Sequence, residues 1–391
     1  MLIRRCAVLF FEPREELAVD LAALFSGAGT LAASLEWIAL APHLDRELAL
    51  TNEQVAVLGA IGQTLWQERA ACEQRFGVDA IAALLDLGLL VADGGGSIDT
   101  FRARDELLRA QQWQPLAAVA HTFRRWQAMT VESGMQFPTF EQLVASYGVP
   151  PAPTWEPPAP GGVVPDLASV TLPAPRCGAL DATLLRRYTG RNFDAQAVLP
   201  LAVAARLLQR TFGAQGQRDM APDAPVLKKT SPSAGGLHPV EAYVLVQRVD
   251  GVAPGLYHYH PLRHSLDPLA ALTAEQARAL AVRATADQDW FADAPLLVFM
   301  AARVFRNFWK YRNHAKAQRA MLLDAGHLSQ TFYLLAAEAG LPAFITAAIN
   351  EKDIEQALGL DPLEHDVIAV CGCGAASGAQ QMPELRIGEL D

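Results

Sequence analysis

The chain has 391 residues, of which 51% are hydrophobic and 19% are charged, and its formal net charge is −10. This length suits roughly two or three domains, and the apolar content excludes a disordered chain because it suffices for a sizeable core. The acidic balance argues against a general nucleic-acid binder and against a binder of anionic membranes, since both need clustered lysine and arginine.

Cysteine usage and hydropathy indicate the compartment. Five cysteines in so long a chain form no disulfide framework, which suits a reducing cytoplasm. The apolar run at residues 6–11 is too short for a signal peptide, and no apolar stretch approaches the roughly 18 residues of a membrane span. We therefore expect a soluble cytoplasmic protein without a transmembrane segment.

The first 149 residues are predicted to form a winged-helix-like domain. Residues 2–11 have the pattern of a strand, Thr51 caps a helix over residues 51–61, and residues 78–87 form a second apolar-periodic helix. A short strand and a glycine turn follow. This part holds 11 Arg, no Lys and 18 Asp or Glu, a net charge of −7, which disfavours the DNA binding usual for a winged helix. A peptide-binding or purely structural role fits better.

A linker or strap is predicted over residues 150–175, where nine of 26 residues are proline. Such a stretch cannot continue a helix or the interior of a sheet, and it prefers an extended geometry. The composition also changes across it, since all five lysines lie between Lys228 and Lys352. The linker therefore separates two domains.

Residues 176–391 alternate helix and strand patterns, which predicts a domain of the α+β class. The helices are expected over residues 200–210, 273–284, 318–339 and 353–358, and the strands over residues 241–248, 255–260, 265–269, 295–300 and 367–371. The helix over 318–339 is apolar nearly all round and ends at Gly340 and Pro342, so we expect it to lie in a core or a subunit interface.

Arg187, Thr189 and Arg191 form the first candidate cluster, inside an Arg-Arg-Tyr-Thr-Gly-Arg-Asn-Phe run. Guanidinium groups match phosphate oxygens and a hydroxyl adds a donor, so this run could clamp a phosphate. A solvated run of charges is the alternative.

The second candidate cluster is the sequence Thr-Ser-Pro-Ser-Ala-Gly-Gly-Leu-His-Pro at residues 230–239, directly before an expected strand. Positions without side chains, flanked by hydroxyls, let backbone amides approach a flat or anionic ligand closely. The spacing of a Rossmann or P-loop nucleotide site is absent from this stretch. An ordinary turn is the alternative.

The third candidate cluster is Lys310 and Tyr311, in the aromatic sequence Phe-Trp-Lys-Tyr before the long helix. An adjacent amine and phenol are a plausible acid–base pair, because desolvation lowers a lysine pKa toward neutrality. A Lys-Tyr step on the surface is the alternative.

Taken together and in this order, the clusters resemble the FMN-dependent azoline dehydrogenases of thiazole- and oxazole-modified peptide maturation, a branch of the nitroreductase-like superfamily. The resemblance covers residues 185–374, about half of the chain. It also includes Gly-Leu-Tyr-His-Tyr, Leu-Leu-Asp-Ala-Gly-His-Leu-Ser-Gln and Ala-Ala-Glu-Ala-Gly-Leu. The resemblance implies FMN, a homodimer with two composite active sites, a modified peptide as substrate, and other maturation enzymes as partners.

The resemblance also assigns residues. Those that would contact the phosphate and ribityl chain of FMN are Arg187, Thr189 and Arg191, and those along its ring system are Ser233, Ala234, Gly235 and Gly236. Lys310 and Tyr311 match the catalytic pair of the family. Further positions near the cofactor are Gln330 on the long helix, Ala347 in the loop after it and Gly372 after the final strand.

Azoline oxidation suits these residue types. The reaction removes a proton from carbon and a hydride to the flavin, so it needs a base beside a flat electron acceptor. Lys310, desolvated and neutral, would take the proton, while Tyr311 orients the substrate or relays the proton; the family suggests reoxidation by dioxygen. The chain departs from the family at residues 312–319 and 346–349, so the oxidised bond could differ from a thiazoline.

Two other functions fit the same residues. One is a non-catalytic peptide-recognition scaffold. If Lys310→Ala keeps FMN but loses dehydrogenation, the scaffold is excluded. The other is an NAD(P)H-dependent nitro- or ene-reductase. In that case, NAD(P)H would rapidly bleach the bound flavin. We expect no metal site, because His258, His260 and His264 lie in a predicted hairpin and Cys371-Gly372-Cys373 lacks a second ligand pair.

Overall fold

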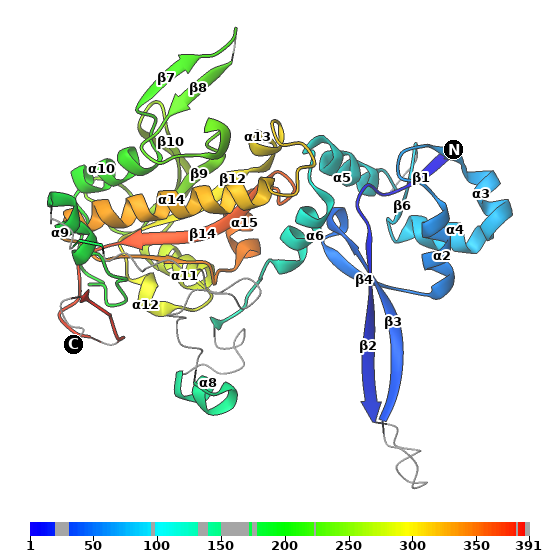
Figure 1. Ribbon diagram of the computed structural model, residues 1–391, viewed down its shortest axis with the longest axis horizontal. Helices are drawn as coiled ribbons and strands as arrows, with labels where there is room; N and C mark the ends of the chain where they lie inside the picture. The colour runs from blue at the N-terminus through cyan, green and yellow to red at the C-terminus, as the bar shows by residue number, and fades with distance from the viewer. Residues whose placement is uncertain are drawn as a thin grey trace, which may run out of the picture.

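The computed structural model describes residues 1–19, 31–94, 98–131, 140–149, 172–173, 178–222, 224–380 and 382–387. It has two parts, an N-terminal part drawn in blue and cyan and a larger C-terminal part drawn in green to red (Figure 1). Within the described ranges, helices are either too short or too polar to cross a membrane.

The C-terminal part is built on a sheet with the strand order β11-β10-β9-β12-β14-β13, in which neighbours pair antiparallel. Its strands are β9 (Val240–Val246), β10 (Gly255–His260), β11 (Ser265–Ala271), β12 (Leu296–Arg303), β13 (Ala343–Thr346) and β14 (His365–Cys373). The central strand β12 is buried from Leu296 to Ala302, because helices cover both faces of the sheet.

One face of this sheet packs against α10 (Leu201–Phe212) and the long helix α14 (Ala317–Glu338). The other face packs against α11 (Ala274–Ala284), α12 (Asp289–Ala292) and α15 (Glu351–Leu358). Smaller elements complete this part: α9 (Ala179–Arg186), α13 (Val304–Phe308), β7 (Gly216–Asp219), β8 (Pro225–Lys228) and the turn η3 (Ala234–Gly236). The α+β class is confirmed.

The N-terminal part contains two small sheets. One has the order β5-β1-β6, from Gln67–Glu68, Leu2–Arg5 and Leu90–Ala92, and the other has the order β2-β3-β4, from Phe10–Val19, Leu31–Ala41 and Arg46–Leu50. The helices are α2 (Asn52–Ala60), α3 (Arg69–Phe76), α4 (Val78–Asp86), α5 (Ile98–Ala110), α6 (Pro115–Arg124) and α8 (Phe140–Tyr147), with the turn η1 at Pro42–Leu44. The winged-helix assignment and the domain boundaries stay predictions, and the predicted linker lies almost wholly outside the described residues.

Several predicted elements are confirmed and one is wrong. Thr51 caps α2 as predicted, since its Oγ1 accepts from Gln54 N at 3.2 Å and Gln54 Oε1 accepts from Thr51 N at 2.9 Å. The single strand expected over residues 2–11 is instead two strands in different sheets. Between them, Cys6 N donates to Leu89 O and Ala7 N donates to Asp105 Oδ1, so these amides bond outside any ladder.

The two parts share a hydrophobic core. Val8, Leu108 and Trp113 of the N-terminal part lie in the same buried cluster as the residues of α14 that face the sheet. The Trp113 indole N–H donates to Leu363 O at 2.9 Å, and its ring lies 5.3 Å from that of Phe308 on α13. The N-terminal part is therefore packed firmly against the segment that leads to Lys310 and Tyr311.

Candidate active site

The loop at residues 233–238 is fastened to α14 by one carboxylate. Ser233 Oγ donates to Asp324 Oδ2 at 2.5 Å, Ala234 N donates to Asp324 Oδ1 at 3.2 Å, and His238 N donates to Ser233 Oγ at 2.9 Å. Burial raises the pKa of Asp324, although the two hydrogen bonds from the loop oppose this shift. The loop is thus held in one conformation above the helix.

Gly235 is the point where the loop meets the predicted catalytic pair. Its φ is +62°, and a Cβ placed on it would lie 2.7 Å from the Tyr311 hydroxyl and 2.8 Å from Lys310 Nζ. The Lys310 amine also lies 5.6 Å from the centre of the Tyr311 ring. The structure therefore brings together the second and third clusters predicted from the sequence. Lys310 is exposed in this chain, in contrast to the desolvated lysine that we expected.

Gly235→Ala should displace the Lys310–Tyr311 pair, because the new methyl group would overlap both side chains. Gly251→Ala is a matched control outside the predicted site: its φ is +70°, so it carries a similar backbone strain of about 1–2 kcal/mol, but its Cβ would meet no atom within 4 Å. We expect similar losses of stability in the two variants by thermal unfolding, and a lower turnover only in Gly235→Ala. Equal turnover would contradict the close approach.

Arg187 and Thr189 meet at a second place, on Tyr333 of α14. Thr189 Oγ1 hydrogen-bonds the Tyr333 hydroxyl at 3.0 Å, and the Arg187 guanidinium lies 5.3 Å from the centre of the tyrosine ring. The same hydroxyl accepts from Ile345 N at 3.1 Å, and burial raises the Tyr333 pKa. Sequence reasoning missed Tyr333. Nine residues separate it from Asp324, about 14 Å along the helix, so the arginine cluster and the loop lie far apart on one chain.

The other predicted cofactor residues do not share the contacts of these two groups. Arg191 donates its backbone N–H to Glu384 Oε1 at 2.6 Å, while Gln330 on α14 and Ala347 after β13 are exposed. Gly372 does not follow the final strand, because β14 extends to Cys373. A Cβ on Gly372 would lie 2.5 Å from the Phe344 ring, so the glycine makes room for packing between strands.

Lys229, which sequence reasoning missed, and His238, which lay in the second cluster without an assigned role, are titratable residues near the two glycines of the loop. They line a small cavity with Ser233 and Asp324 beneath that loop. Burial, with the nearby Arg306 cation, lowers the Lys229 pKa to about 8. Burial, with the charges of Lys229 and Arg306, lowers the His238 pKa to about 4. The imidazole is therefore neutral at physiological pH.

Lys229→Met should stabilise the protein at pH 7. The folded pKa of about 8 lies below the ordinary lysine value of 10.5, so the buried cation destabilises the fold fully below pH 8, and this cost disappears as the pH rises to about 10.5. The shift corresponds to about 3 kcal/mol. Thermal unfolding at pH 7 and pH 10 should show a gain at pH 7 that shrinks at pH 10. The exposed Lys228→Met serves as control and should show neither effect.

The histidines of the β10–β11 hairpin have separate partners. His258 Nε2 lies 3.0 Å from Glu241 Oε2, whereas His264 Nδ1 hydrogen-bonds the Tyr259 hydroxyl at 2.8 Å. His260 Nδ1 accepts from backbone amides of its own turn. Across the part of the chain that the structure describes, potential metal ligands do not gather in threes.

Cys371 and Cys373 are buried in β14. Burial raises the pKa of both thiols, that of Cys373 to about 12. Because the thiolate is the reactive and metal-binding form, these cysteines are inert at neutral pH.

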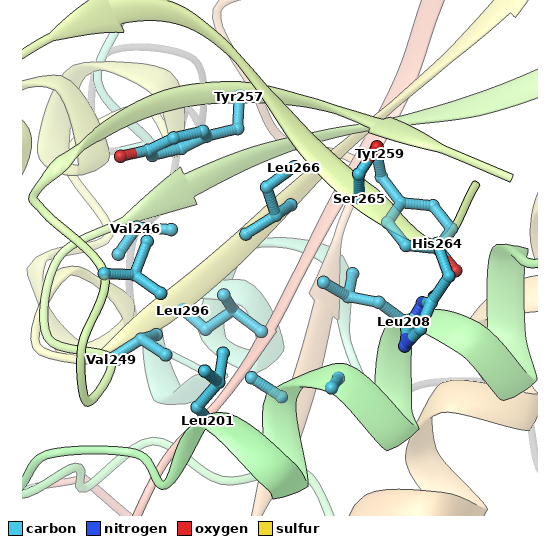
Figure 2. A pocket seen from close by; sticks show the side chains of 13 residues that line it. Leu201, Leu208, Val246, Val249, Tyr257, Tyr259, His264, Ser265, Leu266 and Leu296 are labelled. Atoms are coloured by element: carbon cyan, nitrogen blue, oxygen red, sulfur yellow. The ribbon is translucent and has the colours of Figure 1, made fainter.

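An apolar cavity of about 310 Å³ lies between α10 and the β10–β11 hairpin (Figure 2). Its walls are mainly aliphatic, including Leu201, Leu208 and Leu266, and at one end Tyr259 and His264 bond each other. The hydroxyls of Tyr257 and Tyr259 in this cavity are both hydrogen-bonded within the protein, and the predicted catalytic pair lies outside it, beside Gly235.

Comparisons with known proteins agree on one family. The model of the nitroreductase family matches residues 184–375, a range that contains every predicted site residue. A protein of Methanocaldococcus jannaschii described as a nitroreductase, MJ1384, is 30% identical over 193 residues, which cover 49% of this chain and 90% of that protein.

Peptide-processing proteins are also similar. The trifolitoxin-processing protein TfxB of Rhizobium leguminosarum bv. trifolii is 30% identical over 142 residues, 35% of this chain and 36% of TfxB, so the chain spans about a third of that relative. In the Escherichia coli microcin synthetase McbBCD complex with truncated pro-MccB17 bound, one chain aligns with a TM-score of 0.51 and 18% identity. That alignment covers 70% of this chain and 94% of the other, and it shows a shared fold.

Proposed function

Since this chain belongs to the nitroreductase family, we propose that it is an FMN-dependent dehydrogenase of a ribosomally made, modified peptide. Its reaction would convert an azoline to an azole or perform a related desaturation. The observation that carries the proposal is the close approach of Lys310 Nζ and the Tyr311 hydroxyl to Gly235, which puts an acid–base pair beside the two glycines of the loop. The likeness to TfxB and to the microcin synthetase complex supports a peptide substrate.

The residues present fit FMN. Gly235 lets the Lys310 amine and the Tyr311 hydroxyl approach the loop backbone more closely than a Cβ would allow, and the clamp on Asp324 keeps the loop preformed for a flat ring. Arg187 and Thr189 supply a cation and a hydroxyl that would hold the phosphate. Bound there, FMN would supply the acceptor for the hydride.

Lys310 and Tyr311 would handle the proton. Lys310 would take the proton from the substrate carbon, and Tyr311 would orient the substrate or pass the proton to solvent. Lys310 is exposed in the single chain, so a bound peptide or a second subunit would have to cover it before desolvation could favour the neutral amine. In its positively charged form, Lys310 would also stabilise the negative charge of a reduced flavin bound near the loop.

A homodimer through α14 would complete the site. The arginine cluster and the glycine loop lie about 14 Å apart along α14, so the cluster of one subunit could serve the loop of another. The exposed stripe of α14 includes the apolar Leu322 and Leu323 and the side-chain-free Gly326. We place this dimer in the cytoplasm, with other peptide-maturation enzymes as partners. Sedimentation should give twice the chain mass of 42.2 kDa.

The test uses the purified protein. We expect it to be yellow and to release FMN on denaturation, and an azoline-containing peptide should bleach the flavin without air and lose two hydrogen atoms by mass spectrometry. Colourless protein would refute the flavin. Rapid bleaching by NAD(P)H with an unchanged peptide would favour a nitro- or ene-reductase instead.

A further inference from the structure

A pocket of about 280 Å³ lies at the junction of the two parts of the chain, separate from the loop at Gly235. Its apolar lining comes from the N-terminal part and includes Val8, Leu108, Trp113 and Pro115. Gln63 and Asn313 lie at its exposed edge, one from each part of the chain. The pocket thus joins an apolar interior to a polar rim.

The rim is tied directly to the catalytic segment. Asn313 N donates to Gln112 O at 3.3 Å, across the junction. Asn313 follows Tyr311 by two residues, so their Cα atoms are at most about 7 Å apart. The Tyr311 ring packs against the same core cluster that contains Val8 and Leu108. A group in this pocket would therefore lie close to the acid–base pair.

We propose that this junction pocket binds an apolar side chain of the substrate peptide, a few residues from the position that is oxidised. The inference rests on the proposed function for the existence of a peptide substrate. The volume is slightly below the roughly 300–1,000 Å³ of clefts that hold whole small ligands, and it suits one large side chain.

The chemistry of the lining selects the occupant. The charge of the Arg109 guanidinium is compensated by the Asp105 carboxylate, whose Oδ2 lies 2.8 Å from its Nε, and a second N–H donates to Gln63 O at 3.0 Å, so an acidic side chain in the pocket would meet no uncompensated cation there. The carboxamides of Gln63 and Asn313 at the rim offer donors and acceptors to a peptide backbone. An aliphatic or aromatic side chain fits this setting, and an acidic one does not.

The test measures binding without turnover. The probes are acetyl-Gly-Gly-Phe-Gly-Gly-amide and the same peptide with Glu in place of Phe, followed by saturation-transfer NMR on the full chain. We expect the Phe peptide to bind about ten- to a hundredfold more tightly than the Glu peptide. Gln63→Trp, at the exposed rim, should abolish this difference, whereas Thr64→Trp, on an exposed neighbour outside the pocket, should preserve it.

The outcomes separate this inference from the proposed function. Binding can be measured whether or not the protein holds flavin, so a colourless protein that prefers the Phe peptide would refute the dehydrogenase and support the pocket. A yellow, active protein that binds both peptides equally, or that binds neither, would overturn the pocket alone. Unchanged preference in Gln63→Trp, with its thermal unfolding unaltered, would also overturn it.

Discussion

Replacing Lys310 by alanine should lower the rate of peptide dehydrogenation by about 10²- to 10⁴-fold, the usual contribution of a general base. Flavin content should not change, because the groups assigned to the phosphate, Arg187 and Thr189, follow α9 and contact Tyr333 on the far half of α14. The loop at Gly235 should also stay in place, since its clamp runs through Ser233 and Asp324.

The measurement is anaerobic bleaching of the flavin by an azoline peptide, with flavin content determined on the same samples. Lys316→Ala is the matched control, because Lys316 is an exposed lysine in the same segment that lies outside the contact with Gly235. It should keep full activity. If Lys310→Ala bleaches at the wild-type rate, Lys310 is not the general base. If the azoline peptide does not bleach the wild-type flavin and Lys310→Ala leaves the pathway's peptide product unchanged, the scaffold alternative would replace the enzyme.

Local sequence signals predicted the bounds of several helices in both parts of the chain. Thr51 and Thr273 each form a capping box with the glutamine three residues later. This short pattern marks where the two helices begin. The long helix is predicted from residue 318 and begins at Ala317 in the structure. Its apolar residues and the Gly340 that follows it are also signals that can be read from the local sequence. The nitroreductase-like fold was predicted from the order of six motifs, and the family match confirms it.

Contacts between distant segments could not be predicted in the same way. Lys229 is one of two adjacent lysines, and only the fold buries it while Lys228 stays exposed. Tyr333 looks like any aromatic residue of a buried helix until the chain brings Thr189 to its hydroxyl. The pairing of β2 with β3 was also missed, since Pro13 and the charges around it weaken the pattern of a strand.

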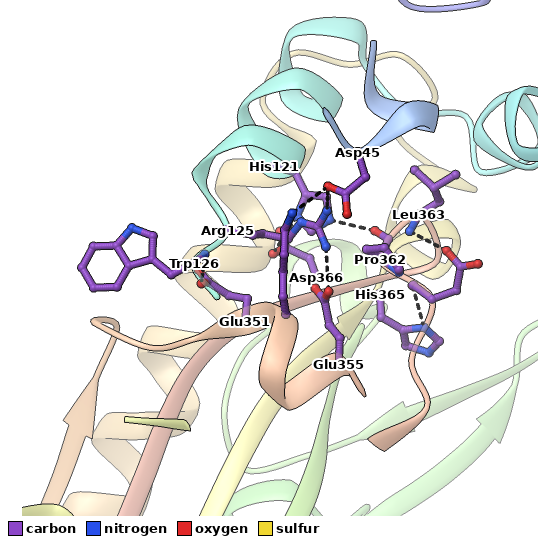
Figure 3. Close-up of polar contacts among 12 residues, drawn as sticks. Asp45, His121, Arg125, Trp126, Glu351, Glu355, Pro362, Leu363, His365 and Asp366 are labelled. Atoms are coloured by element: carbon purple, nitrogen blue, oxygen red, sulfur yellow. Dashed lines mark hydrogen bonds and ion pairs between the residues drawn. The ribbon is translucent and has the colours of Figure 1, made fainter. Parts of the chain in front are cut away.

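Charged residues between the two parts form a second group that only the fold assembles (Figure 3). Arg125 of the N-terminal part donates to Glu355 Oε2 at 2.6 Å and also bonds Asp45. Burial raises the Glu355 pKa to about 7, although Arg125 opposes the shift. Burial also acts to raise the pKa of Asp366, but His121 and Arg124 outweigh it and hold this pKa at about 2.

Arg125→Met should therefore destabilise the protein by about 3–5 kcal/mol, because it leaves the buried Glu355 without its counter-charge. The loss should be larger at pH 8 than at pH 5. The folded pKa of Glu355 lies above the ordinary glutamate value of 4.5, so at pH 5 the carboxyl is already protonated and needs no cation, whereas at pH 8 it is ionised. Denaturant unfolding of Arg125→Met and of Arg125→Met/Glu355→Leu at both pH values tests this. The double variant should recover most of the stability at pH 8, because removing both charges leaves neither of them unpaired. If the double variant is as unstable as Arg125→Met, the packing of the arginine stem, and not its charge, holds the two parts together.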